Sequence, residues 1–137
     1  MKAVVVDDIA KFRDNLIQDL NDYCPEVEIV GTADGVVSAA KEIKSKKPDV
    51  VFLDIQINQG TAFDLLEILG KVDFKIIFTT ASDEYAIKAF KLSAVDYLLK
   101  PIDIDELKTA VNKVNIDLKD DYELLKSNIN EENKSHK

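Results

Sequence analysis

Acidic residues stand directly after two apolar runs of this sequence. The run 50–53 (Val-Val-Phe-Leu) ends at Asp54, and the run 3–6 (Ala-Val-Val-Val) ends at Asp7 and Asp8. Three crowded carboxylates repel one another unless a cation shares their site. Carboxylate oxygens without histidine or cysteine are the ligands that Mg²⁺ prefers. The three acids together therefore predict a magnesium site, although an Asp-Asp pair alone also serves to start a turn.

A hydroxyl and a basic residue follow two further apolar runs. Thr80 ends the run that starts at residue 76, and a threonine hydroxyl can donate a hydrogen bond to an anion. Lys100 follows the run 95–99, and its ammonium supplies the point charge that a phosphoryl oxygen attracts. One hypothesis is that a cis bond before Pro101 aims Lys100. Alternatively, Thr80 is an ordinary strand residue and Lys100 is an exposed lysine before a turn proline, with no functional role.

The elements that carry these residues alternate between strand and helix patterns. The run 50–53 is apolar at every position, which is typical of a strand buried on both faces of a parallel sheet. Ligands of such sheets bind at the carboxyl ends of the strands. The sequence therefore predicts a doubly wound α/β fold with a five-stranded parallel sheet and five helices. The expected strands are 3–6, 27–30, 50–53, 76–78 and 95–99, and the expected helices lie within 12–20, 36–43, 63–69, 86–90 and 104–118.

Apolar spacing also predicts which faces of the helices are buried. Phe12 shares a face with Leu16 and Leu20, and Phe63 and Phe90 are expected in the core.

The last helix has a predicted start and a predicted end. Asp103 is the expected N-cap, with Glu106 three residues later as in a capping box. Its apolar spacing of three and four is interrupted at Asp121, and the composition becomes polar beyond Ser127, which indicates a linker or frayed tail. The helix either packs on the sheet throughout or leaves the domain at its distal end as a connector. We therefore expect one domain over 1–120, followed by a distal helix end and polar tail over 121–137.

Composition narrows the functional classes. The 137 residues suffice for one domain, and the formal net charge of −8 disfavours direct binding to nucleic-acid phosphates. Cys24 is the one cysteine, which excludes an internal disulfide and fits a reducing compartment. No apolar stretch is long enough to cross a bilayer. These features predict a cytoplasmic protein that does not bind membranes.

The strand-end residues resemble those of a known family. Asp7-Asp8, Leu53-Asp54, Thr80-Ala81 and the stretch 96–101 (Asp-Tyr-Leu-Leu-Lys-Pro) are similar to the motifs of response-regulator receiver domains of bacterial two-component systems. The resemblance runs from Lys2 to about Leu118. With 78–90, the stretch 96–101 resembles more narrowly the receivers of LytTR-type (LytR/AlgR-like) regulators. The resemblance to receiver domains implies the flavodoxin-like, CheY-like strand order 2-1-3-4-5.

The resemblance implies a role for each acid. Asp54 would be the phosphoacceptor, and Asp7, Asp8, Asp54 and the backbone carbonyl of Gln56 would bind Mg²⁺. Such a domain is a signalling module and not an enzyme, although it takes part in its own phosphoryl transfer and dephosphorylation. The sequence departs from the family pattern at Ile9, where an acid is frequent.

The resemblance also implies partners and a switch. Thr80 and Lys100 would bind phosphoryl oxygens, and Thr80 and Tyr97 would form the switch. A sensor histidine kinase would be the phosphodonor, since the only histidine, His136, lies in the polar tail. Homodimerisation through the fourth helix and fifth strand would then control transcription. DNA would be bound only by a C-terminal LytTR-type domain beyond this chain.

Other functional classes fit the sequence less well. A phosphatase resembling the haloacid dehalogenase family needs a second acid two residues after the nucleophile, where this chain has Gln56. A nucleotide- or flavin-binding domain needs a glycine-rich phosphate loop, and the four glycines form no such pattern. An interaction module that never accepts phosphate stays open as an alternative.

Overall fold

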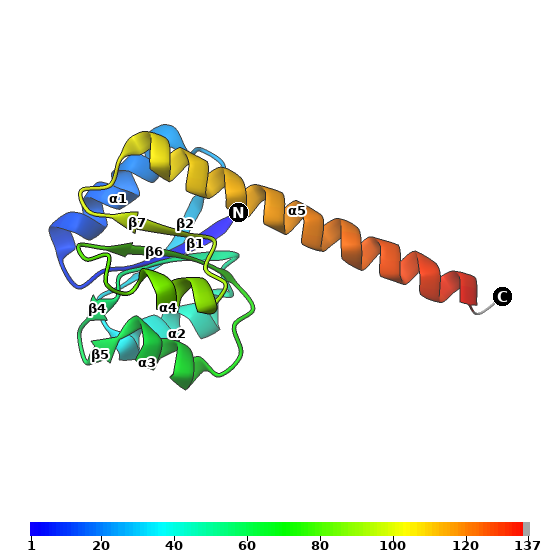
Figure 1. Cartoon of the computed structure of the whole chain (residues 1–137), viewed down its shortest axis with the longest axis horizontal. Coiled ribbons are helices and arrows are strands. Elements are labelled where there is room, and N and C mark those ends of the chain that lie inside the picture. Colours follow the sequence, from blue (N-terminus) through cyan, green and yellow to red (C-terminus); the bar gives the residue numbers. More distant parts are fainter. Residues whose placement is uncertain (136–137) are drawn as a thin grey trace.

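The computed structural model describes residues 1–135, in which strands and helices alternate along the chain (Figure 1). The strands are β1 (Lys2–Val6), β2 (Glu28–Ala33), β3 (Val50–Leu53), β4 (Gln56–Ile57), β5 (Gly60–Thr61), β6 (Lys75–Thr80) and β7 (Asp96–Leu99). The helices are α1 (Ala10–Tyr23), α2 (Val36–Lys46), α3 (Ala62–Leu69), α4 (Ala86–Lys91) and α5 (Ile104–Ser135).

Five of the strands form one parallel sheet in the order β2-β1-β3-β6-β7. This is the predicted order 2-1-3-4-5, counted over the strands of that sheet, so the predicted fold class is confirmed. The short strands β4 and β5 pair with each other as an antiparallel hairpin directly after β3. The hairpin was not predicted, because two-residue strands leave no periodic pattern in a sequence.

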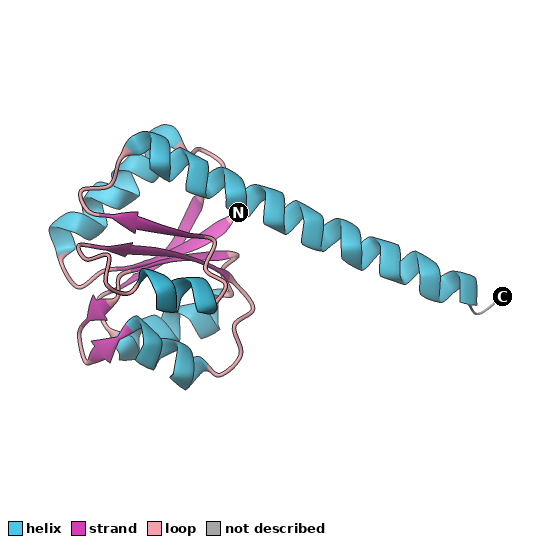
Figure 2. Ribbon diagram, viewed as in Figure 1, coloured by secondary structure: helices cyan, strands magenta, loops and turns pink. Residues whose placement is uncertain are grey.

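Helices cover both faces of the sheet (Figure 2). Successive residues of a strand point to opposite faces, and β3 shows this within its four buried residues. Val51 and Leu53 pack in the cluster that includes side chains of α2, α3 and α4. Val50 and Phe52 pack in the cluster that includes side chains of α1 and α5. This two-sided burial explains why 50–53 is apolar without interruption.

Two aromatic residues that were predicted to face the core are exposed. Phe90 is 83% exposed, because α4 has only six residues and Ala89 is the residue that it buries. Phe12 is 41% exposed, whereas Leu16 and Leu20 of the same helix are buried as predicted. Phe63 packs against the core as predicted. The helical spacing therefore predicted that Leu16 and Leu20 are buried, but not that Phe12 lies at the boundary between the buried and exposed faces of α1.

Helix α5 continues without interruption to Ser135 and runs well beyond the sheet (Figure 1). The helix therefore passes through Asp121, where the apolar spacing is interrupted, and through 128–135, which the sequence analysis expected to be a linker or frayed tail. The segment contains no glycine or proline to end the helix, and leucine, lysine and glutamate favour helix. The tail residue His136 lies outside the described residues. Within residues 1–135 no helix combines the length and apolar character needed to span a bilayer.

The start of α5 gives a first testable prediction. The carboxylate of Asp103 accepts a hydrogen bond from the Glu106 backbone amide at 3.0 Å, which confirms the predicted N-cap. We expect Asp103→Ala to lower the free energy of unfolding by about 1 kcal/mol, because it leaves a helix amide without its partner. Asp103→Asn keeps an accepting oxygen and should retain most of the stability. Urea unfolding measures both, and equal losses in the two variants would contradict the capping role.

Candidate functional site

The register of the parallel strands brings the predicted site residues to one edge of the sheet. Val6 of β1 lies beside Leu53 of β3, and Leu53 lies beside Phe78 of β6. Thr80 of β6 lies beside Leu99 of β7. Residues that follow these strands therefore leave the sheet close together, at its carboxyl edge. This is the edge at which ligands of doubly wound sheets bind.

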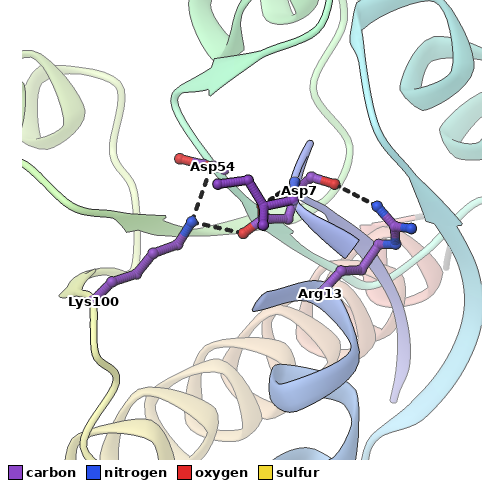
Figure 3. A network of polar contacts seen from close by, with 5 residues as sticks. Asp7, Arg13, Asp54 and Lys100 are labelled. Atoms are coloured by element: carbon purple, nitrogen blue, oxygen red, sulfur yellow. Dashed lines mark hydrogen bonds and ion pairs between the residues drawn. The ribbon is translucent and has the colours of Figure 1, made fainter. Parts of the chain in front are cut away.

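Asp7, Asp8 and Asp54 form an acidic cluster at this edge. Each offers a carboxylate oxygen, and the three oxygens lie within 4.8 Å of one another. Asp7 and Asp54 are buried, whereas Asp8 is exposed. The carboxylate of Asp7 accepts a hydrogen bond from the Ile9 amide at 2.9 Å, and its backbone carbonyl accepts one from Arg13 Nη1 at 2.7 Å (Figure 3). These two bonds fix Asp7 from the side of α1.

Lys100 reaches into the cluster from the loop after β7. Its Nζ lies 2.7 Å from Asp7 Oδ2 and 3.0 Å from Asp54 Oδ2 (Figure 3). The Lys100 side chain is only 10% exposed, so solvent screens these ion pairs less than pairs on the surface. The Lys100–Pro101 peptide bond is cis, as hypothesised. The structure thus brings together Lys100 and the three acids that the sequence singled out.

Burial and the mixed charges set the protonation of the cluster. Burial raises the pKa of Asp54 above its ordinary value, and the charges of Asp7 and Asp8 act in the same direction, while Lys100 opposes them. Burial alone would lower the pKa of the Lys100 ammonium, but its bonds to Asp7 and Asp54 outweigh burial and raise it. The ammonium therefore stays charged beside carboxylates that repel one another.

The donor set fits a divalent cation. Three carboxylates and one ammonium leave two negative charges uncompensated. Hard oxygen ligands of this kind select Mg²⁺ or Ca²⁺ over softer metals. Asp8 is the exposed member and is open to an ion from solvent. The cluster could hold such a metal.

A cavity of about 530 Å³ opens onto the cluster. Its wall includes Asp8, Asp54, Gln56, Thr80 and Lys100, so five predicted site residues face one space. Thr80 is buried at the end of β6.

Tyr97 contacts this site indirectly. Its hydroxyl donates a hydrogen bond to the backbone carbonyl of Ser82, which lines the cavity. Burial raises the pKa of the Tyr97 hydroxyl, so it remains a donor at neutral pH. The loop after β6 is thereby tied to β7.

A row of aromatic rings, missed in the sequence, connects Tyr97 to the far wall of the cavity. The ring of Tyr97 lies 6.2 Å from that of Phe78, and the ring of Phe78 lies 5.9 Å from that of Phe63. Phe63 in turn lies 5.9 Å from Tyr85, whose hydroxyl accepts a hydrogen bond from Gln56 Nε2 at 3.1 Å. The sequence analysis named Tyr97 and Phe63 separately, and Phe78 and Tyr85 only as part of the stretch 78–90, but it did not predict that the four rings pack in a row.

Fold and site together define a doubly wound α/β domain with an acidic cluster and a lysine at the carboxyl edge of its sheet. The family model of the response regulator receiver domain matches residues 3–112. The chain belongs to this family, as the resemblance predicted.

Relatives and solved structures agree with this assignment. The sensory transduction protein LytT of Bacillus anthracis is 43% identical over 115 residues, which are 82% of this chain and 46% of that protein. An uncharacterised response regulatory protein of Vibrio parahaemolyticus is 43% identical over 84% of this chain and 48% of its own length. The response regulatory domain of mrkE from Klebsiella pneumoniae superposes with a TM-score of 0.79 at 30% identity, covering 88% of this chain and 99% of that structure. The name LytT agrees with the predicted LytTR-type kinship, and the chain spans about half the length of these curated relatives.

Proposed function

We propose that this receiver domain accepts a phosphoryl group on Asp54 and signals through the resulting change in shape. The observation that carries the proposal is the buried Asp54 carboxylate, held 3.0 Å from the Lys100 ammonium at the wall of an open cavity. A carboxylate in this setting can attack phosphorus, while a neighbouring cation offsets charge on the transferred oxygens.

The transfer is an in-line displacement. An Asp54 carboxylate oxygen forms the new bond to phosphorus as the bond between phosphorus and the donor atom breaks. The donor atom keeps the electron pair of the broken bond; for a phosphohistidine donor it is an imidazole nitrogen, which needs no further proton when the other ring nitrogen carries one. Lys100 and Thr80, which line the same cavity as Asp54, would bind phosphoryl oxygens. Asp7, Asp8, Asp54 and the Gln56 carbonyl would hold Mg²⁺, which supplies charge neutralisation when bound.

Incubation with acetyl phosphate and Mg²⁺ tests this proposal. The intact mass should rise by one phosphoryl group, and the gain should decay on removal of the donor, because the acyl phosphate is hydrolysed at its own site. Chelation of Mg²⁺ should suppress the gain. A chain that keeps its mass with every small phosphodonor is instead the interaction module that the sequence left open.

Magnesium should also stabilise the unphosphorylated domain. Mg²⁺ at ten times its dissociation constant should add about 1.4 kcal/mol to the free energy of unfolding, because it binds only the folded cluster. This corresponds to a rise of several degrees in Tm. Asp8→Asn, which removes the exposed carboxylate, should reduce the rise. Scanning calorimetry at matched ionic strength measures both proteins, and equal shifts would place the metal elsewhere.

A second copy of the chain is the proposed partner of the α4–β7 surface. Ile87 and Phe90 on α4 are exposed by 74% and 83%, and Leu92 after α4 and Leu99 at the end of β7 are also exposed. Adjacent exposed apolar residues of this kind mark an interaction surface. Phosphorylation would pull Thr80 toward the new charge, let Tyr97 rearrange, and shift the population toward a shape that pairs.

Solution mass by light scattering tests this pairing. Phe90→Asp should weaken pairing of the phosphorylated protein at least tenfold, because it places a charge in a patch that pairing would bury. Val37→Asp, at a 53% exposed position on α2, should leave pairing unchanged, because α2 packs on β2 and β1 and β7 lies at the other edge of the sheet. Tyr97→Ala should be phosphorylated normally yet pair weakly. Equal pairing by the wild type and Phe90→Asp would exclude this surface.

The named relatives support a wider role in a longer protein. We infer that a cytoplasmic sensor histidine kinase domain is the natural donor, and that residues 1–120 form the receiver. Because the relatives named LytT are about twice as long, the distal part of α5 would lead to a LytTR-type DNA-binding domain that controls transcription. The full-length protein should then bind DNA as a phosphorylated dimer, and this chain alone should not.

A further inference from the structure

An aromatic ring lies beside the ammonium of Lys100, on the side of α1. The Lys100 Nζ is 4.7 Å from the centroid of the Phe12 ring. The same Nζ makes its two ion pairs with Asp7 and Asp54 at 2.7 and 3.0 Å. Phe12 is 41% exposed and lines the site cavity, so its ring sits at the rim of the site and not in the core with Leu16.

This contact has the geometry of a cation–π interaction. The face of an aromatic ring is negative and attracts an ammonium within about 6 Å of its centroid. Lysine has a long flexible stem, and ion pairs alone fix the distance of its ammonium better than its direction. The Asp7 and Asp54 carboxylates contact the ammonium on the side of the sheet, and the Phe12 ring contacts it on the side of α1. Together they reduce the number of positions that Lys100 can occupy.

The ring contact also differs from the ion pairs during phosphoryl transfer. Asp54 gives up its negative charge to a new bond with phosphorus, so its attraction for Lys100 changes as the reaction proceeds. The attraction between the ammonium and the ring is independent of that change. Phe12 can therefore keep Lys100 near the transferring oxygens while its carboxylate partner is consumed.

We propose that Phe12 is a positioning residue for Lys100 in phosphoryl transfer to Asp54, a role that rests on the proposed function. Phe12 acts through Lys100 and does not itself touch the phosphoryl group. A leucine at this position keeps apolar bulk on α1 but loses the ring, whereas a tyrosine keeps the ring.

The first test measures the contact without any phosphorylation. In protein labelled with ¹³C-lysine, the ring current of Phe12 should displace the ε-methylene signal of Lys100 upfield. The displacement should disappear in Phe12→Leu and persist in Phe12→Tyr. Tyr23→Leu is a matched control, because Tyr23 ends the same helix with a similar exposure of 48%. It should leave the Lys100 signal in place.

The second test measures the rate of mass gain with acetyl phosphate and Mg²⁺. Phe12→Leu should react about two- to fivefold more slowly than the wild type, the change expected for one partly exposed cation–π contact. Phe12→Tyr should restore the rate, and Tyr23→Leu should not alter it. An unchanged Lys100 signal or an unchanged rate in Phe12→Leu, or a failure of tyrosine to rescue, would overturn the proposal. A wild type that gains no mass would instead refute the proposed function, with the Lys100 signal still reporting on the contact.

Discussion

Asp54→Asn will abolish phosphoryl uptake and leave the domain folded. An amide cannot take the place of the carboxylate oxygen that bonds to phosphorus, so the expected loss is complete. Burial raises the pKa of Asp54, so its ionised form lowers stability at pH above the ordinary aspartate pKa. Asparagine removes that cost, and the variant should be at least as stable as the wild type near neutral pH. Intact mass and urea unfolding measure the two effects.

The matched control for this variant is an acid far from the cluster. Asp73 is exposed and pairs loosely with Lys71 at 3.6 Å, so Asp73→Asn changes the same charge without touching the site. It should gain a phosphoryl group at the wild-type rate. A mass gain retained in Asp54→Asn would show that another residue is the acceptor.

Lys100→Met will have the second largest effect, on both reaction and stability. Methionine keeps most of the stem but leaves Asp7 and Asp54 without their shared ammonium. The loss of one group that offsets charge on the transferred oxygens should slow phosphorylation about 100-fold or more. Removing one partner of buried ion pairs should also lower the free energy of unfolding by about 3 kcal/mol without Mg²⁺. Mass gain against time and urea unfolding provide the measurements.

An ion pair at the surface supplies the comparison. Lys113 pairs with Asp96 at 2.9 Å, but its side chain is 51% exposed. Lys113→Met should cost less than about 1 kcal/mol, because solvent screens such pairs. Equal losses of stability in Lys100→Met and Lys113→Met would show that burial does not strengthen the ion pairs of Lys100.

The strand ends were predictable because two simple rules apply to them. An uninterrupted apolar run such as 50–53 has one interpretation in a short α/β chain, a strand buried on both faces. Parallel strands then bring the residues that follow them to one edge, so Asp7, Asp54 and Lys100 could be grouped without coordinates. The details of the sheet order came from the family resemblance, and the structure agrees with it.

The contacts between helices and the site were not predictable in this way. Phe12 and Phe90 are apolar residues at helical spacing, yet one lies against an ammonium and the other faces solvent. Periodicity gives a direction around a helix, and a helix of six residues such as α4 is too short to fix even that. Arg13 is the single arginine of the sequence, but nothing near it in the chain indicates that it bonds the Asp7 carbonyl.

The most direct test of the account locates the phosphoryl group. After reaction with acetyl phosphate and Mg²⁺, borohydride reduces an aspartyl phosphate to homoserine at the residue that carried it, and peptide mass spectrometry identifies the position. The account predicts homoserine at position 54 and at no other acid of the cluster. A phosphorylated protein with aspartate intact at 54, or with homoserine at 7 or 8, would contradict it.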